Sequence, residues 1–264
     1  MSDSGSRGVL IPALALLLVA AVATDLVRRA IPRPPRANPA AVAAPGRGGT
    51  VAAPHEHAAG VPAAPPTDRL DSAARLLALG RIETEGAGTY LPAMLAENDS
   101  VLHRWPDDRA RRPLRVAVIR DFTVPGFREV FVANMAWAIG RWNGVGLPVW
   151  LEQGTDSTDA DIVVTWVERL DSNRTGRTDL TWQRRGPIVK VHVVLATHLP
   201  DGRAVEPGQM VAIALHEMGH ALGLGHSPAK SDALYPETAA TDLTSRDRAT
   251  ATLLYSIPPG SLRR

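Results

Sequence analysis

The sequence contains no cysteine among its 264 residues, which excludes disulfides and cysteine-ligated metal sites and leaves no indication of a redox compartment. Lysine is almost absent too: Lys190 and Lys230 are the only two, so the basic residues are nearly all arginine, and the formal net charge is only +2. These arginines are scattered and are not interleaved with aromatic residues. We therefore expect no nucleic-acid partner.

Long apolar runs are also scarce, and the clearest one lies at the N-terminus. Residues 9–23 are apolar apart from Pro12, follow Arg7, and end in small residues that resemble a signal-peptidase site. Extended over residues 9–27, the run is long enough to span a thin bilayer. Residues 1–29 are therefore interpreted as an N-terminal apolar helix that is either a cleaved signal peptide or an uncleaved membrane anchor; a buried core helix is the third alternative. We expect the protein to be exported, either secreted and extracytoplasmic or anchored to the membrane.

Two segments separate this run from the remainder of the chain. Residues 30–66 are rich in Ala, Pro and Gly, and this composition predicts a disordered linker, in which His55 and His57 are expected to be solvated. Residues 67–110 are interpreted as a helical connector or a pro-segment, with one helix from Leu70 that Gly80 ends and another over 91–103. The sequence does not decide between these two roles.

Residues 111–257 are predicted to form one α+β domain. Alternating or continuous apolar segments predict strands, and 3.6-residue periodicity predicts helices. The strands are expected at 114–119, 147–151 and 161–167, with a hairpin of 180–183 and 188–195; the helices are expected at 127–142, from 209 through the histidine pair, and from 244 to 255.

The most informative stretch begins at His216. His216 and His220 are four residues apart, so on a helix their imidazoles lie on one face and can reach a single Zn²⁺. Glu217 is rotated about 100° from His216, beside the metal rather than among its ligands, where a carboxylate can act as general base. Gly223 can end the helix and turn the chain, which allows His226 to return as the third ligand. Three protein ligands leave the fourth position of a tetrahedral site open, which is typical of a catalytic zinc.

Two other interpretations of this stretch were weighed. The histidines could lie in the core without a metal, but five fixed positions of this kind are expected by chance with a probability on the order of 10⁻⁵, from composition alone. A structural zinc would close its fourth position with Cys or His, and the chain has no cysteine. We therefore predict one catalytic Zn²⁺, held by His216, His220 and His226.

The pattern H-E-x-x-H-x-x-G-x-x-H resembles the zinc signature of the metzincin metallopeptidases. Ser227 and the segment 233–236 are most similar to the matrixin, or matrix-metalloprotease-like, branch. The resemblance implies a metzincin-like zincin domain: a twisted mixed sheet, an active-site helix and a C-terminal helix. It also implies a zinc-dependent endopeptidase acting on protein or peptide substrates, with Glu217 as general base. The chain departs from the family at Leu234, where matrixins carry a methionine beneath the metal.

Some features implied by the family have weaker support in this sequence. If the order of elements follows the metzincins, residues 189–195 form the edge strand over the cleft. His192 and His198 do not complete the second, structural zinc site of matrixins, so one zinc is expected. Asp156, Asp159 and Asp161 could hold Ca²⁺, although a solvated turn is the favoured interpretation.

The missing methionine also motivates an alternative function, a non-catalytic zinc-containing peptide-binding module derived from a peptidase. A zinc hydrolase of non-peptide amides is a further alternative, which the resemblance disfavours.

Overall fold

A computed structural model describes residues 68–263, all of which belong to one compact unit of the chain, His55–Arg264. The predicted N-terminal apolar helix and the predicted linker lie outside the described residues. Within residues 68–263, every helix is too short or too polar to cross a membrane.

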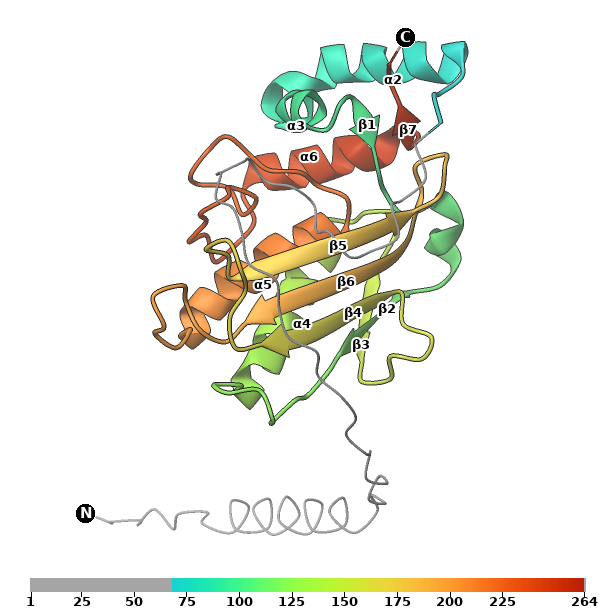
Figure 1. Cartoon of the computed structure of the whole chain (residues 1–264). Helices are drawn as coiled ribbons and strands as arrows, with labels where there is room; N and C mark the ends of the chain where they lie inside the picture. Colours follow the sequence, from blue (N-terminus) through green and yellow to red (C-terminus); the bar gives the residue numbers. More distant parts are fainter. Residues whose placement is uncertain (1–67, 264) are drawn as a thin grey trace, which may run out of the picture. The chain divides into compact units, whose positions relative to one another are not determined.

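The centre of the fold is a five-stranded sheet of mixed direction (Figure 1). Its strands run in the order β3-β2-β4-β6-β5, in which the first four are parallel and β5 is antiparallel to β6. The bounds are β2 Leu114–Val118, β3 Leu151–Gly154, β4 Ile162–Val167, β5 Gly176–Trp182 and β6 Ile188–Ala196. In β4 every second side chain is buried, as expected for β-branched and aromatic residues on a sheet packed on one face. The predicted α+β fold with a mixed sheet is confirmed.

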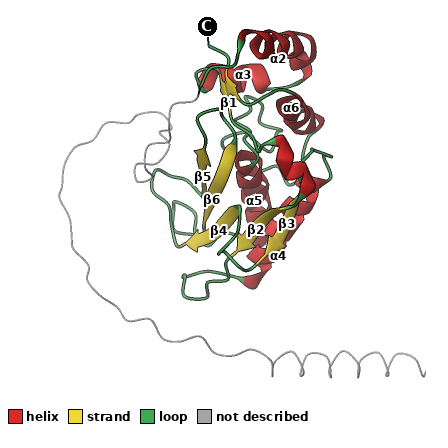
Figure 2. Ribbon diagram, turned by 90° about the vertical axis from the view of Figure 1, so that its right-hand side faces the viewer, coloured by secondary structure: helices red, strands yellow, loops and turns green. Residues whose placement is uncertain are grey.

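Helices α4 (Glu129–Asn143) and α5 (Pro207–Ala221) pack against each other on one face of this sheet (Figure 2). The apolar stripe predicted for α4 is buried at Phe131, Met135, Ala138 and Trp142. Helix α6 (Ser245–Ser256), predicted from 244 to 255, begins with a capping box in which Thr244 accepts from the Asp247 backbone N–H. The predicted active-site and C-terminal helices are therefore both present.

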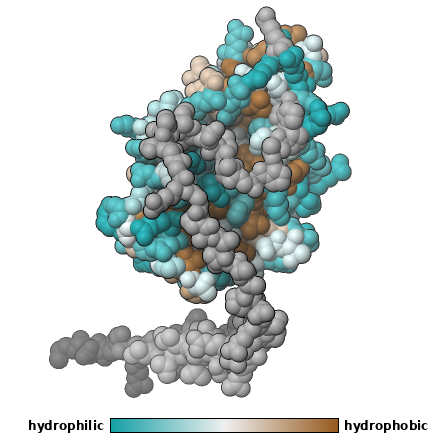
Figure 3. Space-filling view, in the orientation of Figure 1, coloured by the Kyte–Doolittle hydropathy of each residue, from teal (hydrophilic) through white to brown (hydrophobic). Residues whose placement is uncertain are grey.

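The segment before the sheet is folded onto the same unit. It contains α2 (Ser72–Glu85), the 3₁₀ turn η1 (Gly86–Gly88), α3 (Leu91–Glu97), β1 (Val101–Leu102) and a second 3₁₀ turn, η2 (Asp107–Arg111). β1 pairs antiparallel with β7 (Gly260–Ser261), near the C-terminus. The buried side chains of this segment and those of the sheet and helices form one hydrophobic cluster. On the face shown in Figure 3, hydrophobic areas interrupt the hydrophilic surface.

Several predicted boundaries were wrong, each for a local reason. Gly80 does not end α2, because an isolated glycine costs a helix only about 1 kcal/mol; the helix runs to its cap at Gly86. The predicted helix over 91–103 stops at Glu97, and positive φ at Asp99 and Ser100 turns the chain into β1. The strand predicted at 147–151 begins only at Leu151, since Pro148 has no N–H to donate to a strand ladder.

The predicted edge strand was also wrong. Residues 189–195 lie within β6, which is flanked on both sides by β4 and β5, so β5 forms this edge of the sheet. The error has a clear cause: β5 begins at Gly176 with residues that are not apolar, so the predicted strand started only at residue 180.

Candidate metal centre

Helix α5 is fixed both at its N-terminus and at the residue just before its first histidine. Pro207 occupies its first turn, and Glu206 and Gln209 form a capping box around its N-terminus. On the side facing α4, the indole N–H of Trp142 donates to the Leu215 carbonyl oxygen at 3.0 Å. His216 and Glu217, one and two residues further on, are therefore carried by a buried and well-anchored part of the helix.

The three predicted ligands converge. One nitrogen of each of His216, His220 and His226 lies within 4.8 Å of the others, and no fourth His, Cys, Asp or Glu among residues 68–263 joins the group. The rings of His220 and His226 are nearly perpendicular, with centroids 4.8 Å apart. His216 is buried, whereas His220 and His226 are partly exposed. The cluster therefore faces solvent on the side of its second and third members.

Hydrogen bonds to the main chain define which ring nitrogens can bind a cation. Nδ1 of His216 lies 2.8 Å from the Ala233 carbonyl oxygen, and Nδ1 of His220 lies 2.7 Å from that of Leu224. Because a carbonyl oxygen only accepts, each Nδ1 carries a proton, and the Nε2 lone pair is the one that such a ring can offer to a cation. These two Nε2 atoms are 2.9 Å apart. Two lone pairs brought this close fit a shared cation, and three imidazoles suit Zn²⁺.

The turn after α5 brings His226 to the cluster. Gly223 has φ of +95°, the positive value predicted from the motif, and its N–H donates to the His220 carbonyl oxygen at 2.8 Å. Ser227 then bonds through its backbone N–H to the Leu234 carbonyl oxygen, at 2.8 Å. Leu234 is fully buried and faces Gly219 of α5, so it supplies an apolar floor between the first two histidines.

Glu217 is beside this group but makes its contacts with the sheet. Its carboxylate accepts a hydrogen bond of 2.6 Å from the Thr178 hydroxyl of β5. Burial raises the pKa of the Glu217 carboxyl, while the His216 charge and the Thr178 hydrogen bond act in the opposite direction. A carboxylate held in this way beside a metal site is suited to accept and release a proton. Sequence reasoning missed Thr178, since nothing in its local pattern distinguishes it from other strand threonines.

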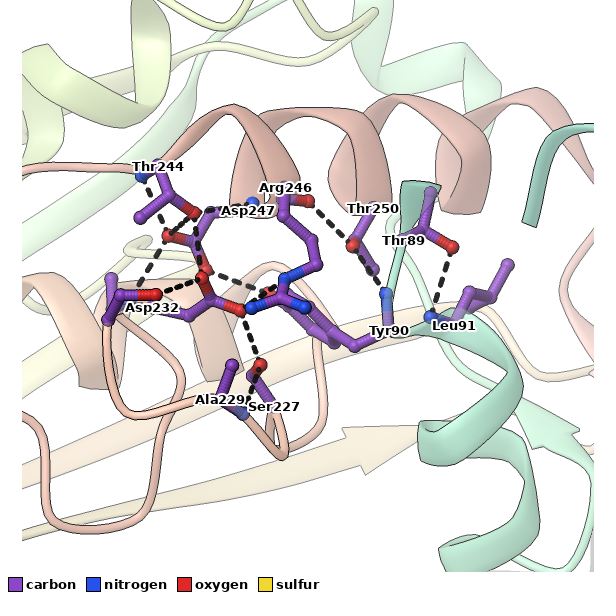
Figure 4. A network of polar contacts seen from close by, with 12 residues as sticks. Thr89, Tyr90, Leu91, Ser227, Ala229, Asp232, Thr244, Arg246, Asp247 and Thr250 are labelled. Atoms are coloured by element: carbon purple, nitrogen blue, oxygen red, sulfur yellow. Dashed lines mark hydrogen bonds and ion pairs between the residues drawn. The ribbon is translucent and has the colours of Figure 1, made fainter. Parts of the chain in front are cut away.

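A buried polar network supports the loop behind His216 (Figure 4). Asp247 on α6 accepts from the backbone N–H of Ala233 at 3.0 Å and from the Tyr90 hydroxyl at 3.3 Å. The Ala233 carbonyl oxygen in turn bonds His216, so α6 is connected to the first ligand through a single residue. Asp232, also buried, pairs with Arg246 at 2.8 Å.

The other metal sites weighed from the sequence are not assembled among the described residues. Asp161 is buried and pairs with Arg109 at 2.7 Å, while the Asp159 carboxylate lies near Arg115. Because arginines neutralise these carboxylates, the structure does not show a calcium site there. His192 of β6 is hydrogen-bonded to Thr165 of β4, and His198, which follows β6, is hydrogen-bonded to its neighbour Thr197.

Three features together define a metzincin-type zinc metallopeptidase domain. They are a mixed five-stranded sheet, a buried helix with two histidines one turn apart, and a third histidine after a glycine turn. Residues 128–256 match the family model Peptidase_M10, described as Matrixin, and this part of the chain is a matrixin-like metzincin. The match extends from just before α4 to the end of α6. No curated protein matches the chain.

Proposed function

We propose that this protein is an endopeptidase that hydrolyses peptide bonds within protein or peptide substrates, with Glu217 as general base. The observation that carries the proposal is the position of Glu217: a buried carboxylate next to three converging histidines, held by Thr178. His216, His220 and His226 would hold the ion. When bound, Zn²⁺ supplies Lewis acidity and makes a water molecule a stronger nucleophile near neutral pH.

The side chains and backbone of this chain transfer the proton, orient the carboxylate and bind the substrate. Glu217 takes a proton from the attacking water and gives it to the leaving amine. Thr178 orients the carboxylate. Among residues 68–263, no strand pairs with the outer edge of β5, whose backbone N–H and C=O groups can accept an extended substrate as a further strand. Such pairing would align a peptide beside the histidines, because β5 also carries Thr178.

The site of action is proposed from the sequence alone. The apolar run over residues 9–27 favours export, with the domain either released or held at the membrane by that segment. Fractionation of cells producing the full chain, followed by N-terminal sequencing of the recovered protein, would distinguish cleavage from anchoring. Recovery of an uncleaved chain from the cytosol would contradict export.

The enzymatic proposal is tested with the full chain, a peptide library and a chelator. We expect internal peptide bonds to be cut, chelation to stop cleavage, and Glu217→Gln to lower turnover by roughly 10²–10⁴-fold with metal content unchanged. Near-normal cleavage by Glu217→Gln would remove Glu217 from this role. A wild-type protein that binds metal and library peptides without cutting them would instead indicate a binding module.

A further inference from the structure

The turn that carries the chain from His220 to His226 is packed against residues 90–105, which precede the sheet; we call these residues the brace. The backbone N–H of Gly225, next to His226, donates to the Sδ atom of Met94 at 2.9 Å. Met94 lies on α3 and is 1% exposed. The third predicted ligand therefore follows directly after a residue that is bonded to a segment outside the region matched by the family model.

The same turn approaches the brace too closely for any side chain to lie between them. A Cβ atom on Gly223 would overlap the carbonyl oxygen of His103, and one on Gly225 would lie 2.5 Å from Cγ of Met94. The two glycines on either side of Leu224 thus rest on the brace with their main chain. Movement of Met94 or His103 would be transmitted to the backbone that sets the position of His226.

The brace is also joined to both helices behind the metal site. The Trp105 indole N–H donates to the Ala221 carbonyl oxygen at the end of α5, at 2.9 Å. The Arg104 guanidinium donates to the Ile257 carbonyl oxygen after α6, at 2.8 Å, and the Tyr90 backbone N–H donates to the Thr250 hydroxyl of α6, at 3.1 Å. Each bond crosses from the brace to an element that contacts a histidine or its supporting loop.

Removal of the brace would expose much of the core. Five large side chains of the brace are exposed by 2% or less: Tyr90, Leu91, Met94, Leu102 and Trp105. The burial of each such side chain stabilises the folded protein. Detachment of all five at once would cost as much as the whole stability of an ordinary domain. A segment of this kind differs from a removable inhibitory peptide, which must leave a folded enzyme behind.

We propose that the brace is a permanent part of the metal centre, in which Met94 and the His103 carbonyl position the loop of His226, and is not a pro-segment whose removal creates activity. The consequence for catalysis depends on the proposed function, but the consequence for metal binding does not. Met94 is a positioning residue in this proposal, since it acts on His226 through Gly225.

The first experiment compares three variants of the full chain. Met94→Ala removes the contact with Gly225, and Met94→Leu keeps most of its volume. Leu91→Ala is the matched control, because it also truncates a fully buried apolar side chain of α3, whereas the contact with Gly225 is made by Met94. The measurements are Zn²⁺ affinity by chelator competition, the visible absorption spectrum of the Co²⁺-loaded protein, and Tm.

We expect Met94→Ala to weaken Zn²⁺ binding by about 10–100-fold, as loss of a residue supporting a ligand does, and to alter the Co²⁺ spectrum. Met94→Leu should restore both toward the wild type. Leu91→Ala should lower Tm with a wild-type spectrum and affinity. Equal losses of affinity in Met94→Ala and Leu91→Ala, or wild-type affinity in Met94→Ala, would overturn the proposal.

A second experiment does not depend on the folding of a core variant. A specific protease site is inserted between Arg111 and Arg112, which are both exposed, and the folded full chain is cut there. We expect the two fragments to elute together, with Zn²⁺ affinity unchanged and without any rise in peptide cleavage. Dissociation of the N-terminal fragment with Zn²⁺ affinity retained, or a tenfold rise in cleavage, would show that residues 68–111 are a pro-segment. If neither the intact nor the cut protein cleaves peptides, the proposed function is wrong. The Zn²⁺ affinity of the cut protein still tests whether the brace is part of the metal centre.

Discussion

Thr178 on the edge strand β5 donates a 2.6 Å hydrogen bond to the Glu217 carboxylate of α5. The same hydroxyl lies 3.2 Å from the Glu217 carbonyl oxygen, so one side chain connects the strand to both the backbone and the carboxylate of this residue. The bond joins the two elements between which the proposed reaction takes place: the helix that holds the metal ligands and the strand that would pair with substrate. Its removal should affect the orientation of Glu217 more than the fold.

Replacing Thr178 with valine keeps the shape of the side chain and removes the donor. We expect kcat to fall by roughly 10–100-fold, the usual loss when a group supporting a catalytic residue is removed, with Zn²⁺ content unchanged. The same substitution at Thr181, which lies on the same strand with an exposed side chain, is the control and should leave kcat within twofold. Steady-state kinetics on a cleaved library peptide would check both. Equal effects at the two positions would show that the hydrogen bond is unimportant.

Removal of the metal should lower the stability of the folded unit. A ligand present at 1,000 times its Kd stabilises the native state by about 4 kcal/mol, so chelation should lower Tm by several degrees. Calorimetry with and without a chelator measures this difference. His216→Ala should begin with a lower Tm and respond little to the chelator, since it lacks one of the three ligands. An unchanged Tm in the wild-type protein on chelation would contradict tight metal binding.

Gly219 and Leu234 are packed too tightly for a larger side chain at position 219. A Cβ on Gly219 would lie 2.7 Å from Cδ2 of Leu234 and 2.8 Å from Cζ2 of Trp142. Gly219→Ala should therefore destabilise the protein by about 1–3 kcal/mol through overpacking. In the background of Leu234→Ala, which removes one of the two clashing groups, the same substitution should cost at least about 0.5 kcal/mol less. Urea unfolding of the four proteins in this cycle gives the coupling, and strictly additive effects would refute the contact.

Asp232 should make the stability of the metal loop depend on pH. Burial alone would raise the pKa of Asp232, but hydrogen bonds from Ser227, Arg246 and Thr244 outweigh it and lower the pKa below the ordinary value of 3.8. A lowered folded pKa means that the stabilisation is complete above pH 3.8 and is lost as the pH falls through the folded value. Asp232→Asn should thus cost about 1–3 kcal/mol at pH 7, and this difference from the wild type should shrink below pH 3.8.

Asp242→Asn is the control for this experiment. Asp242 also pairs with an arginine, Arg141, but its side chain is 55% exposed. Solvent-exposed pairs contribute at most about 1 kcal/mol, so this substitution should change the free energy of unfolding much less at every pH. A difference between Asp232→Asn and the wild type that stays constant from pH 7 to pH 3 would show that Asp232 does not carry the expected charge effect.

The convergence of the three histidines was predictable because their geometry is mostly local. His216 and His220 are separated by one helical turn, so their convergence follows from helix formation, which the apolar residues before them favour. Gly223 adopts the positive φ that its place in the motif required. The partner of Glu217 was not predictable in this way, because Thr178 lies 39 residues earlier in the sequence and reaches it only through the packing of β5 on α5.

The edge strand of the sheet and the burial of the brace likewise depend on tertiary contacts that the local sequence did not reveal. β5 is the edge strand although its first four residues are polar, since a strand at an edge is partly solvated and need not be apolar. The predicted catalytic domain began only at residue 111 and so left out the brace. Its burial against α5 and α6 depends on contacts such as Trp105–Ala221, 116 residues apart.

The sequence by itself determined the chemistry of the site: three imidazoles and a carboxylate in an order that a single helix and turn bring together. Only the tertiary structure decided what holds them in place: the Thr178 hydroxyl for Glu217, the Ala233 carbonyl and Asp247 for His216, and Met94 for the turn to His226. The physical reason is the range of each interaction. Helical spacing acts over a few residues, whereas these supports join positions far apart in the chain that meet only when the core is formed.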